Sequence, residues 1–143
     1  MNIILPGDKD YESRPSVQRK SLRINLNENI YGTFVEIGAG QEVARNFYRV
    51  GAASGTIAKS MSAYDKSFSD SIYGKEENGR YVTQNRLDKM LDHEMDLLEK
   101  RISRDKNPDK FFFVYANTVA TIDFVKKFKI VNSIVPISIA LFA

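Results

Sequence analysis

The sequence predicts an α/β or α+β domain in which short strands, each followed by a helix, surround one sheet. Two observations predict this class. An apolar segment runs into a glycine-rich turn and then into a helical pattern, and an aromatic segment near residue 111 precedes a second helical pattern. The chain of 143 residues, with 43% hydrophobic and 27% charged residues, is long enough for one buried core.

The first expected elements lie between residues 22 and 50. Leu22, Ile24 and Leu26 alternate with polar residues, which is typical of a half-buried strand. Residues 31–37 are rich in β-branched and aromatic side chains and predict a second strand, which ends at a Gly-Ala-Gly turn. A helix is expected over residues 41–50, because its apolar positions recur at helical spacing.

The clearest helical pattern covers residues 84–103, with Thr83 as the candidate N-cap. His93 projects away from the apolar face and is expected to be a solvated surface residue. Glu94 falls inside that face, so we expect it to pair with Arg101 or to lie at the core margin, with a ligand role as the alternative. The apolar face comprises Leu87, Met90, Leu91, Leu98 and Ile102.

The region after Pro108 predicts three further elements. Residues 111–115 form a compact aromatic and β-branched strand, residues 116–118 a turn, and residues 119–128 a short helix with apolar positions three residues apart.

The chain divides into three parts by composition. Residues 1–20 are expected to be a flexible extension without the apolar core of a signal peptide, and residues 21–129 an α/β region. Residues 130–143 carry no charge and contain Pro136, but they are shorter than the roughly 20 residues needed to span a bilayer. We therefore expect an apolar strand or tail, no membrane association, and a cytoplasmic protein.

Composition excludes several kinds of chemistry. The chain has no cysteine and one histidine, which removes disulfides, thiol nucleophiles and cysteine or multi-histidine metal sites. His93-Glu94 begins a zinc-protease signature, but Leu97 stands where the second histidine is needed. The net charge of +3 is spread along the chain and does not favour a nucleic-acid partner.

The segment from Phe34 to Gln41 resembles the first motif of class I S-adenosylmethionine-dependent methyltransferases, in which an apolar strand ends in an acidic residue and a glycine-rich turn. Glycines let a ligand approach the backbone closely. The pattern departs at Glu42 and at Val43, where the last glycine of a dinucleotide turn is missing. The turn therefore predicts either a nucleotide-type ligand site or a tight structural turn. The candidate ligand-binding residues here are Glu36, Gly38, Gly40 and Gln41.

A second stretch of small residues, 51–60, is similar to a phosphate-binding loop, but Lys59 arrives three residues too late for that motif. Ser54, Thr56 and Lys59 remain as candidate polar contacts for the same phosphate-bearing molecule. Close packing of small residues is the other interpretation. The residues identify neither the cofactor nor a catalytic group.

Several motifs resemble a poorly characterised bacterial family whose longer members are labelled nicotinate or nicotinamide mononucleotide adenylyltransferase, or TonB-dependent receptor. The resemblance covers residues 21–129 and corresponds to the N-terminal part of those proteins. It implies a nucleotide-handling protein, with nucleotidyltransferase activity by family label only. The motifs are Leu22-Arg23-Ile24-Asn25-Leu26, Tyr31-Gly32-Thr33-Phe34, Gly38-Ala39-Gly40-Gln41, Ala53-Ser54-Gly55-Thr56-Ile57-Ala58-Lys59, Met61-Ser62-Ala63-Tyr64-Asp65 and Ala116-Asn117-Thr118-Val119-Ala120.

Neither label agrees with the residues. Mononucleotide adenylyltransferases bind the triphosphate with an H-x-G-H or T-x-G-H motif, whereas His93 is followed by Glu94 and Met95. The receptor label requires an export signal, which the sequence does not contain. The loss of charge and of family resemblance at Ile130 predicts a truncated or frameshifted product, and hence an incomplete domain.

Two functional hypotheses follow. The first is a cytoplasmic nucleotide-handling protein that binds a nucleotide-type small molecule. The alternative is a non-enzymatic protein-interaction module, including assembly as a homo-oligomer, for which the amphipathic helix over residues 84–103 would supply the surface.

Overall fold

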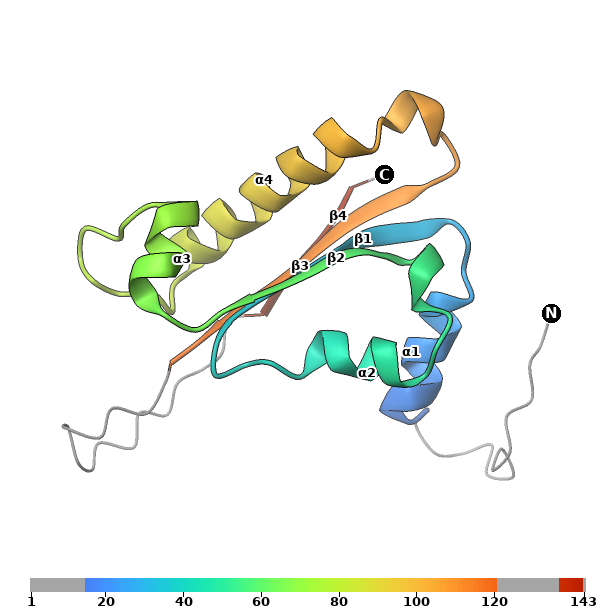
Figure 1. The fold of residues 1–143 in the computed structure, drawn as a ribbon, viewed down its shortest axis with the longest axis horizontal. Helices are drawn as coiled ribbons and strands as arrows, with labels where there is room; N and C mark the ends of the chain where they lie inside the picture. Colours follow the sequence, from blue (N-terminus) through green and yellow to red (C-terminus); the bar gives the residue numbers. More distant parts are fainter. Residues whose placement is uncertain (1–14, 121–136, 143) are drawn as a thin grey trace.

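The computed structural model describes residues 15–120 and 137–142. Four strands form one sheet in the order β2-β1-β3-β4, in which β1 is parallel to β2 and β3, and β4 is antiparallel to β3. Helices α1 and α2 lie on one face of the sheet and α4 lies on the other (Figure 1). This arrangement confirms the α/β class. The elements, with η marking short 3-10 helices, are α1 (Val17–Asn25), β1 (Ile30–Gly38), α2 (Val43–Arg49), η1 (Ala53–Gly55), β2 (Ile57–Ala63), α3 (Lys66–Tyr73), α4 (Gln84–Arg101), η2 (Arg104–Lys106), β3 (Phe111–Val119) and β4 (Ile137–Phe142).

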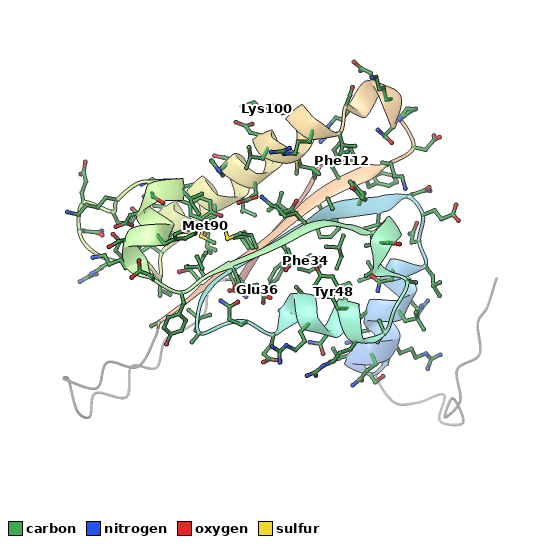
Figure 2. All side chains as sticks on the ribbon, viewed as in Figure 1. Phe34, Glu36, Tyr48, Met90, Lys100 and Phe112 are labelled. Atoms are coloured by element: carbon green, nitrogen blue, oxygen red, sulfur yellow. The ribbon has the colours of Figure 1, made fainter. Side chains whose placement is uncertain are left out.

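The core lies on both faces of the sheet because successive strand residues point to opposite sides. On the side of α4, the main buried residues are Val35, Ile37, Phe112, Val114, Leu87, Met90, Leu91, Met95 and Leu98. On the side of α2 they are Phe34, Ala44, Ile57, Phe113 and Tyr115. Figure 2 shows Phe34 and Glu36 between the sheet and α2, and Met90 between the sheet and α4. The central strands β1 and β3 are therefore covered on both faces.

Four predicted elements are confirmed: the strand that became β1, the helix that became α2, the long helix α4, and the strand over residues 111–115, which forms the first part of β3. The hydroxyl of Thr83 caps α4 by accepting a hydrogen bond from the backbone N–H of Arg86 at 3.2 Å. The apolar stripe of α4 is buried against the sheet of its own chain, with Leu87 and Met90 fully inaccessible. That stripe is therefore not available to a protein partner.

The strand predicted around Leu22 is wrong, since these residues belong to helix α1. Ser16 caps this helix by accepting the backbone N–H of Arg19 at 3.2 Å. Asn25 anchors the helix to α2 and the turn after it, because its Nδ2 donates to the carbonyl oxygens of Phe47 at 2.9 Å and Gly51 at 2.7 Å. The buried contacts of α1 are thus polar. The alternation of apolar residues in the sequence therefore does not indicate how this helix packs.

Strand β2 and the end of β3 also differ from expectation. The stretch of small residues after Thr56 continues as the edge strand β2, which the alternation rule does not detect. The turn predicted at residues 116–118 is wrong, because β3 continues through Asn117 and Thr118 to Val119. Both polar side chains are buried and bonded there: Asn117 contacts Glu36, and Thr118 donates to a backbone carbonyl.

Two sequence expectations fall largely outside the described residues. Of the helix expected over residues 119–128, only the first two residues are described, and Val119 ends β3. Within the apolar segment 130–143, residues 137–142 form β4 beside β3. Among the helices of the described part of the chain, none has the length and hydropathy to cross a membrane.

Candidate functional site at the carboxyl ends of β1 and β3

The direction in which the chain adds strands to the sheet reverses between β1 and β3. From β1 the chain crosses by α2 to β2 on one side, whereas β3, on the other side of β1, is reached through α3 and α4. The carboxyl ends of the three parallel strands lie at the same edge of the sheet, near α3 (Figure 1). Such a reversal creates a crevice beyond the strand ends, where α/β proteins bind ligands.

The turn over residues 38–41 leaves this edge in close contact with β3. Gly38 has a positive φ of 78°, and a Cβ on it would lie 2.0 Å from the carbonyl oxygen of Val119. A Cβ on Gly40 would lie 2.5 Å from Cγ2 of Val119 and 3.0 Å from Oδ1 of Asn117. Gln41 closes the turn, because its Nε2 donates to the carbonyl oxygen of Gly38 at 2.9 Å. The glycines are required by the contact between the turn and β3.

Glu36 supports the turn from inside the molecule. Its side chain is 3% exposed, and its carboxylate accepts the backbone N–H groups of Val43 at 2.9 Å and Ala44 at 3.2 Å. Nδ2 of Asn117 donates to the same carboxylate at 3.0 Å. Glu42, at the N-cap position of α2, makes no side-chain capping bond. A carboxylate from β1 therefore occupies the place at the start of α2 that a phosphate would take.

Asn117 connects the turn to β3. Its Nδ2 also donates to the carbonyl oxygen of Gly40 at 2.9 Å and lies 3.4 Å from the hydroxyl of Tyr115. Burial raises the pKa of the Tyr115 hydroxyl and the charge of Glu36 raises it further, while the hydrogen bond from Asn117 lowers it. Oδ1 of Asn117 is buried without a hydrogen-bond partner among the described residues. This polar cluster fixes the geometry of the switch point.

The segment that follows β2 carries exposed aromatic side chains close to the carboxyl end of that strand. Ile37 and Ala63 are the last register partners of β1 and β2, and Tyr64 follows Ala63 directly. The side chain of Tyr64 is 67% exposed, and Phe68 in the first turn of α3 is also exposed. Nζ of Lys66, at the start of α3, lies 4.8 Å from the ring centroid of Tyr81. The edge thus combines exposed aromatic rings with a cation.

The seven predicted ligand-binding residues do not form one cluster. Glu36, Gly38, Gly40 and Gln41 come together at the carboxyl end of β1, as described above. Ser54 is exposed in η1, and Thr56 is fully buried and donates its hydroxyl to the carbonyl oxygen of Asn25 at 3.1 Å. Both lie at the amino end of β2, and Lys59 lies on the α4 face of the sheet.

The expected environment of Glu94 is partly wrong. Glu94 is 1% exposed, but its partners are Lys59, with which it forms an ion pair, and the hydroxyl of Tyr73 at 2.7 Å. Burial and the hydrogen bond to Glu94 raise the pKa of Tyr73. Arg101 is exposed and does not pair with Glu94. His93 is half-buried rather than fully solvated, with its ring 5.3 Å from that of Tyr73.

A second buried charge was not anticipated. The side chain of Arg86 is fully buried, and its Nη2 donates to the hydroxyl of Ser69 at 2.7 Å. Its guanidinium lies 5.0 Å from the ring centroid of Tyr81 and 3.4 Å from the carboxylate of Glu76. This cluster ties α3 and the following loop to the start of α4.

Within residues 15–120 and 137–142, no group of three or more acidic or histidine side chains could hold a metal ion.

Comparison with known proteins gives one structural likeness. No protein-family model and no curated protein sequence matches the chain. The crystal structure of a competence-damaged protein (CinA) superfamily protein from Enterobacter cloacae is similar, with a TM-score of 0.53 and 13% sequence identity over 100% of this chain and 86% of that chain. At this identity the likeness shows a shared fold. It gives no support to the TonB-dependent receptor label.

Proposed function

We propose that this chain is a nucleotide-handling α/β domain that binds a nucleotide-type small molecule at the carboxyl ends of β1 and β3. The observation that carries the proposal is the switch point between these strands, where the turn over residues 38–41 packs against Val119. Ligands of open α/β sheets bind outside the strand ends at such points. The resemblance to proteins labelled mononucleotide adenylyltransferases implies the same class of ligand.

The contacts of the edge favour particular parts of a nucleotide. Tyr64 offers an exposed ring on which a base can stack, and stacking of one base on an aromatic side chain contributes about 1–3 kcal/mol. Lys66, two residues further on, supplies a positive charge for the phosphate. The phosphate does not bind at the start of α2, because Glu36 already accepts the N–H groups there.

We confine the proposal to nucleotide binding and do not extend it to adenylyl transfer. The only histidine, His93, lies on α4 against the ring of Tyr73, and the histidine motif of those transferases is absent. An assay of pyrophosphate release from ATP and nicotinamide mononucleotide tests the transfer separately. Release of pyrophosphate would extend the function to catalysis, and its absence would leave the binding proposal unchanged.

Isothermal titration calorimetry tests the binding site directly. ATP, NAD, nicotinamide mononucleotide and S-adenosylmethionine are titrated into the full chain, and at least one of them is expected to bind. Tyr64→Ala should weaken that binding by about tenfold or more through the loss of stacking. Tyr48→Ala is the matched control, because Tyr48 is similarly exposed but lies on α2. Absence of heat from all four ligands, or equal effects of the two substitutions, would contradict the proposal.

A further inference from the structure

A β-bulge in β2 determines which face of the sheet Lys59 occupies. Ile57 pairs with Gly32 and Lys59 pairs with Thr33, so β2 advances two residues where β1 advances one. In a regular strand, residues two apart share a face, but Ile57 packs on the α2 side whereas Lys59 contacts α4. Bulges near functional sites commonly redirect one side chain in this way. Here the bulge directs an ammonium group to the α4 side of an edge strand.

The ammonium group of Lys59 is bound on one side by a buried carboxylate, and the Lys59 side chain is open to solvent on the other side. Glu94 is almost completely buried, forms an ion pair with Lys59 and accepts a hydrogen bond from Tyr73 at 2.7 Å. The side chain of Lys59 is nevertheless 41% exposed. The buried carboxylate therefore fixes the position of a cation that remains accessible to solvent.

The exposed side of Lys59 opens into a groove between the sheet edge and α4. The groove has a volume of about 140 Å³, below the roughly 300–1,000 Å³ of sites for drug-sized ligands. It suits a small molecule. The groove is lined by Tyr31, Thr33, Ala58, Lys59, Leu97, Leu98, Arg101 and Ile102.

The charges around the groove favour a monovalent anion. Lys59 and Arg101 line it, and Glu94 balances one of these two positive charges. Arg101 makes no ion pair with another residue in the described part of the chain. Lys110, whose Nζ lies 5.9 Å from the ring centroid of Tyr31, does not line the groove. The ammonium group comes from β2 and the guanidinium from α4, and together they match the two oxygens of a carboxylate.

Most of the other lining residues are apolar and favour a ligand with a hydrocarbon part. Leu97 and Ile102 are partly buried, and Leu98 is buried. The hydroxyl of Thr33 also lines the groove and forms no side-chain hydrogen bond with another described residue. Apolar side chains of this kind bind a short alkyl chain. The few polar groups of the groove then orient the polar end of the ligand.

We propose that this groove binds a small organic monocarboxylate, with the carboxylate at Arg101 and Lys59 and the alkyl part against Leu97, Leu98 and Ile102. The site is separate from the proposed nucleotide site. Lys59 pairs with Thr33, which precedes Gly38 by five residues, a distance of about 16 Å along a strand. Failure of one proposal therefore leaves the other intact.

Titration of the full chain with hexanoate, followed by NMR of the leucine and isoleucine methyl groups, tests this proposal. Hexanoate is expected to shift the methyl signals of Leu97, Leu98 and Ile102. Arg101→Gln should weaken the binding by about tenfold or more through loss of a charge-assisted hydrogen bond. Lys100→Gln, at an exposed neighbouring position that does not line the groove, should change it less than about twofold.

Two further probes separate the parts of the proposal. Hexanol has the alkyl chain without the charge, and inorganic phosphate has the charge without the alkyl chain, so both should bind at least about tenfold more weakly than hexanoate. The proposal is overturned if hexanol binds as tightly as hexanoate, if phosphate does so, or if Arg101→Gln has no greater effect than Lys100→Gln. A lack of methyl shifts with hexanoate would also overturn it.

Discussion

Nδ2 of Asn117 on β3 donates a hydrogen bond of 3.0 Å to the carboxylate of Glu36 on β1, and the two residues are register partners in the sheet. The same carboxylate accepts two backbone N–H groups from the first turn of α2. One buried side chain therefore links two central strands and the helix that follows the glycine turn. This relationship links the carboxyl ends of β1 and β3 to α2 and leaves no place for a phosphate at the start of α2.

Replacement of Glu36 by Gln should lower the free energy of unfolding by about 1–3 kcal/mol, because the amide group cannot accept all three hydrogen bonds. Urea denaturation followed by circular dichroism measures the change. Glu42→Gln is the control, since Glu42 occupies the N-cap position of α2 without a capping bond and should change stability by no more than about 0.5 kcal/mol. Equal effects of the two substitutions would refute the capping role of Glu36.

Gly38→Ala and Gly51→Ala separate backbone strain from steric contact. Both glycines have a φ near +80°, but a Cβ on Gly51 meets nothing within 4 Å, whereas one on Gly38 lies 2.0 Å from a backbone oxygen. Gly51→Ala should cost about 1–2 kcal/mol from the left-handed conformation alone. Gly38→Ala should cost at least about 1–3 kcal/mol more. Thermal unfolding of both variants measures the difference, and similar losses would disprove close contact with Val119.

Lys59→Met should destabilise the chain by about 1–3 kcal/mol, because it leaves the buried carboxylate of Glu94 without its cation. Adding Glu94→Gln to that variant should restore part of the loss. The exposed pair of Glu99 and Arg104 provides the control, and Glu99→Gln should change stability by less than about 1 kcal/mol. Chemical denaturation of these three variants and the unmodified chain gives the comparison. A double variant less stable than Lys59→Met alone would exclude this explanation.

Acidification should destabilise the protein partly through Glu76. Burial raises the pKa of this carboxyl, but hydrogen bonds from Lys89 and Asn85, together with the charges of Lys89 and Arg86, lower it below the ordinary value of 4.5. Because the folded state binds the proton less tightly than the unfolded state, this stabilisation is present above pH 4.5 and is lost as the pH falls through the folded pKa.

The melting temperature measured between pH 7 and pH 3 tests this dependence. Glu76→Gln should reduce stability at neutral pH and flatten the decrease below pH 4.5. Glu77→Gln, at the exposed neighbouring position, should leave the pH profile close to that of the unmodified chain. An unchanged slope in Glu76→Gln would show that other carboxyl groups dominate acid unfolding.

Sequence patterns were sufficient for the elements whose stability comes from an apolar face. The strand ending at Gly38, the helix beginning near Val43 and the helix capped by Thr83 all agree with the structure, because periodic burial and a local cap define them. The same patterns were misleading for α1, which is held by the polar side chain of Asn25, and for β2, which is a half-buried edge strand.

The sequence by itself narrowed the fold to α/β or α+β, and it placed the glycine turn after β1 and Glu94 on the apolar face of its helix. Only the tertiary structure decided which groups these residues contact. Lys59 and Glu94 are 35 residues apart, and Glu36 and Asn117 are 81 apart, so no local spacing relates them. The order of the strands and a single bulge bring them together, and these depend on packing across the whole sheet.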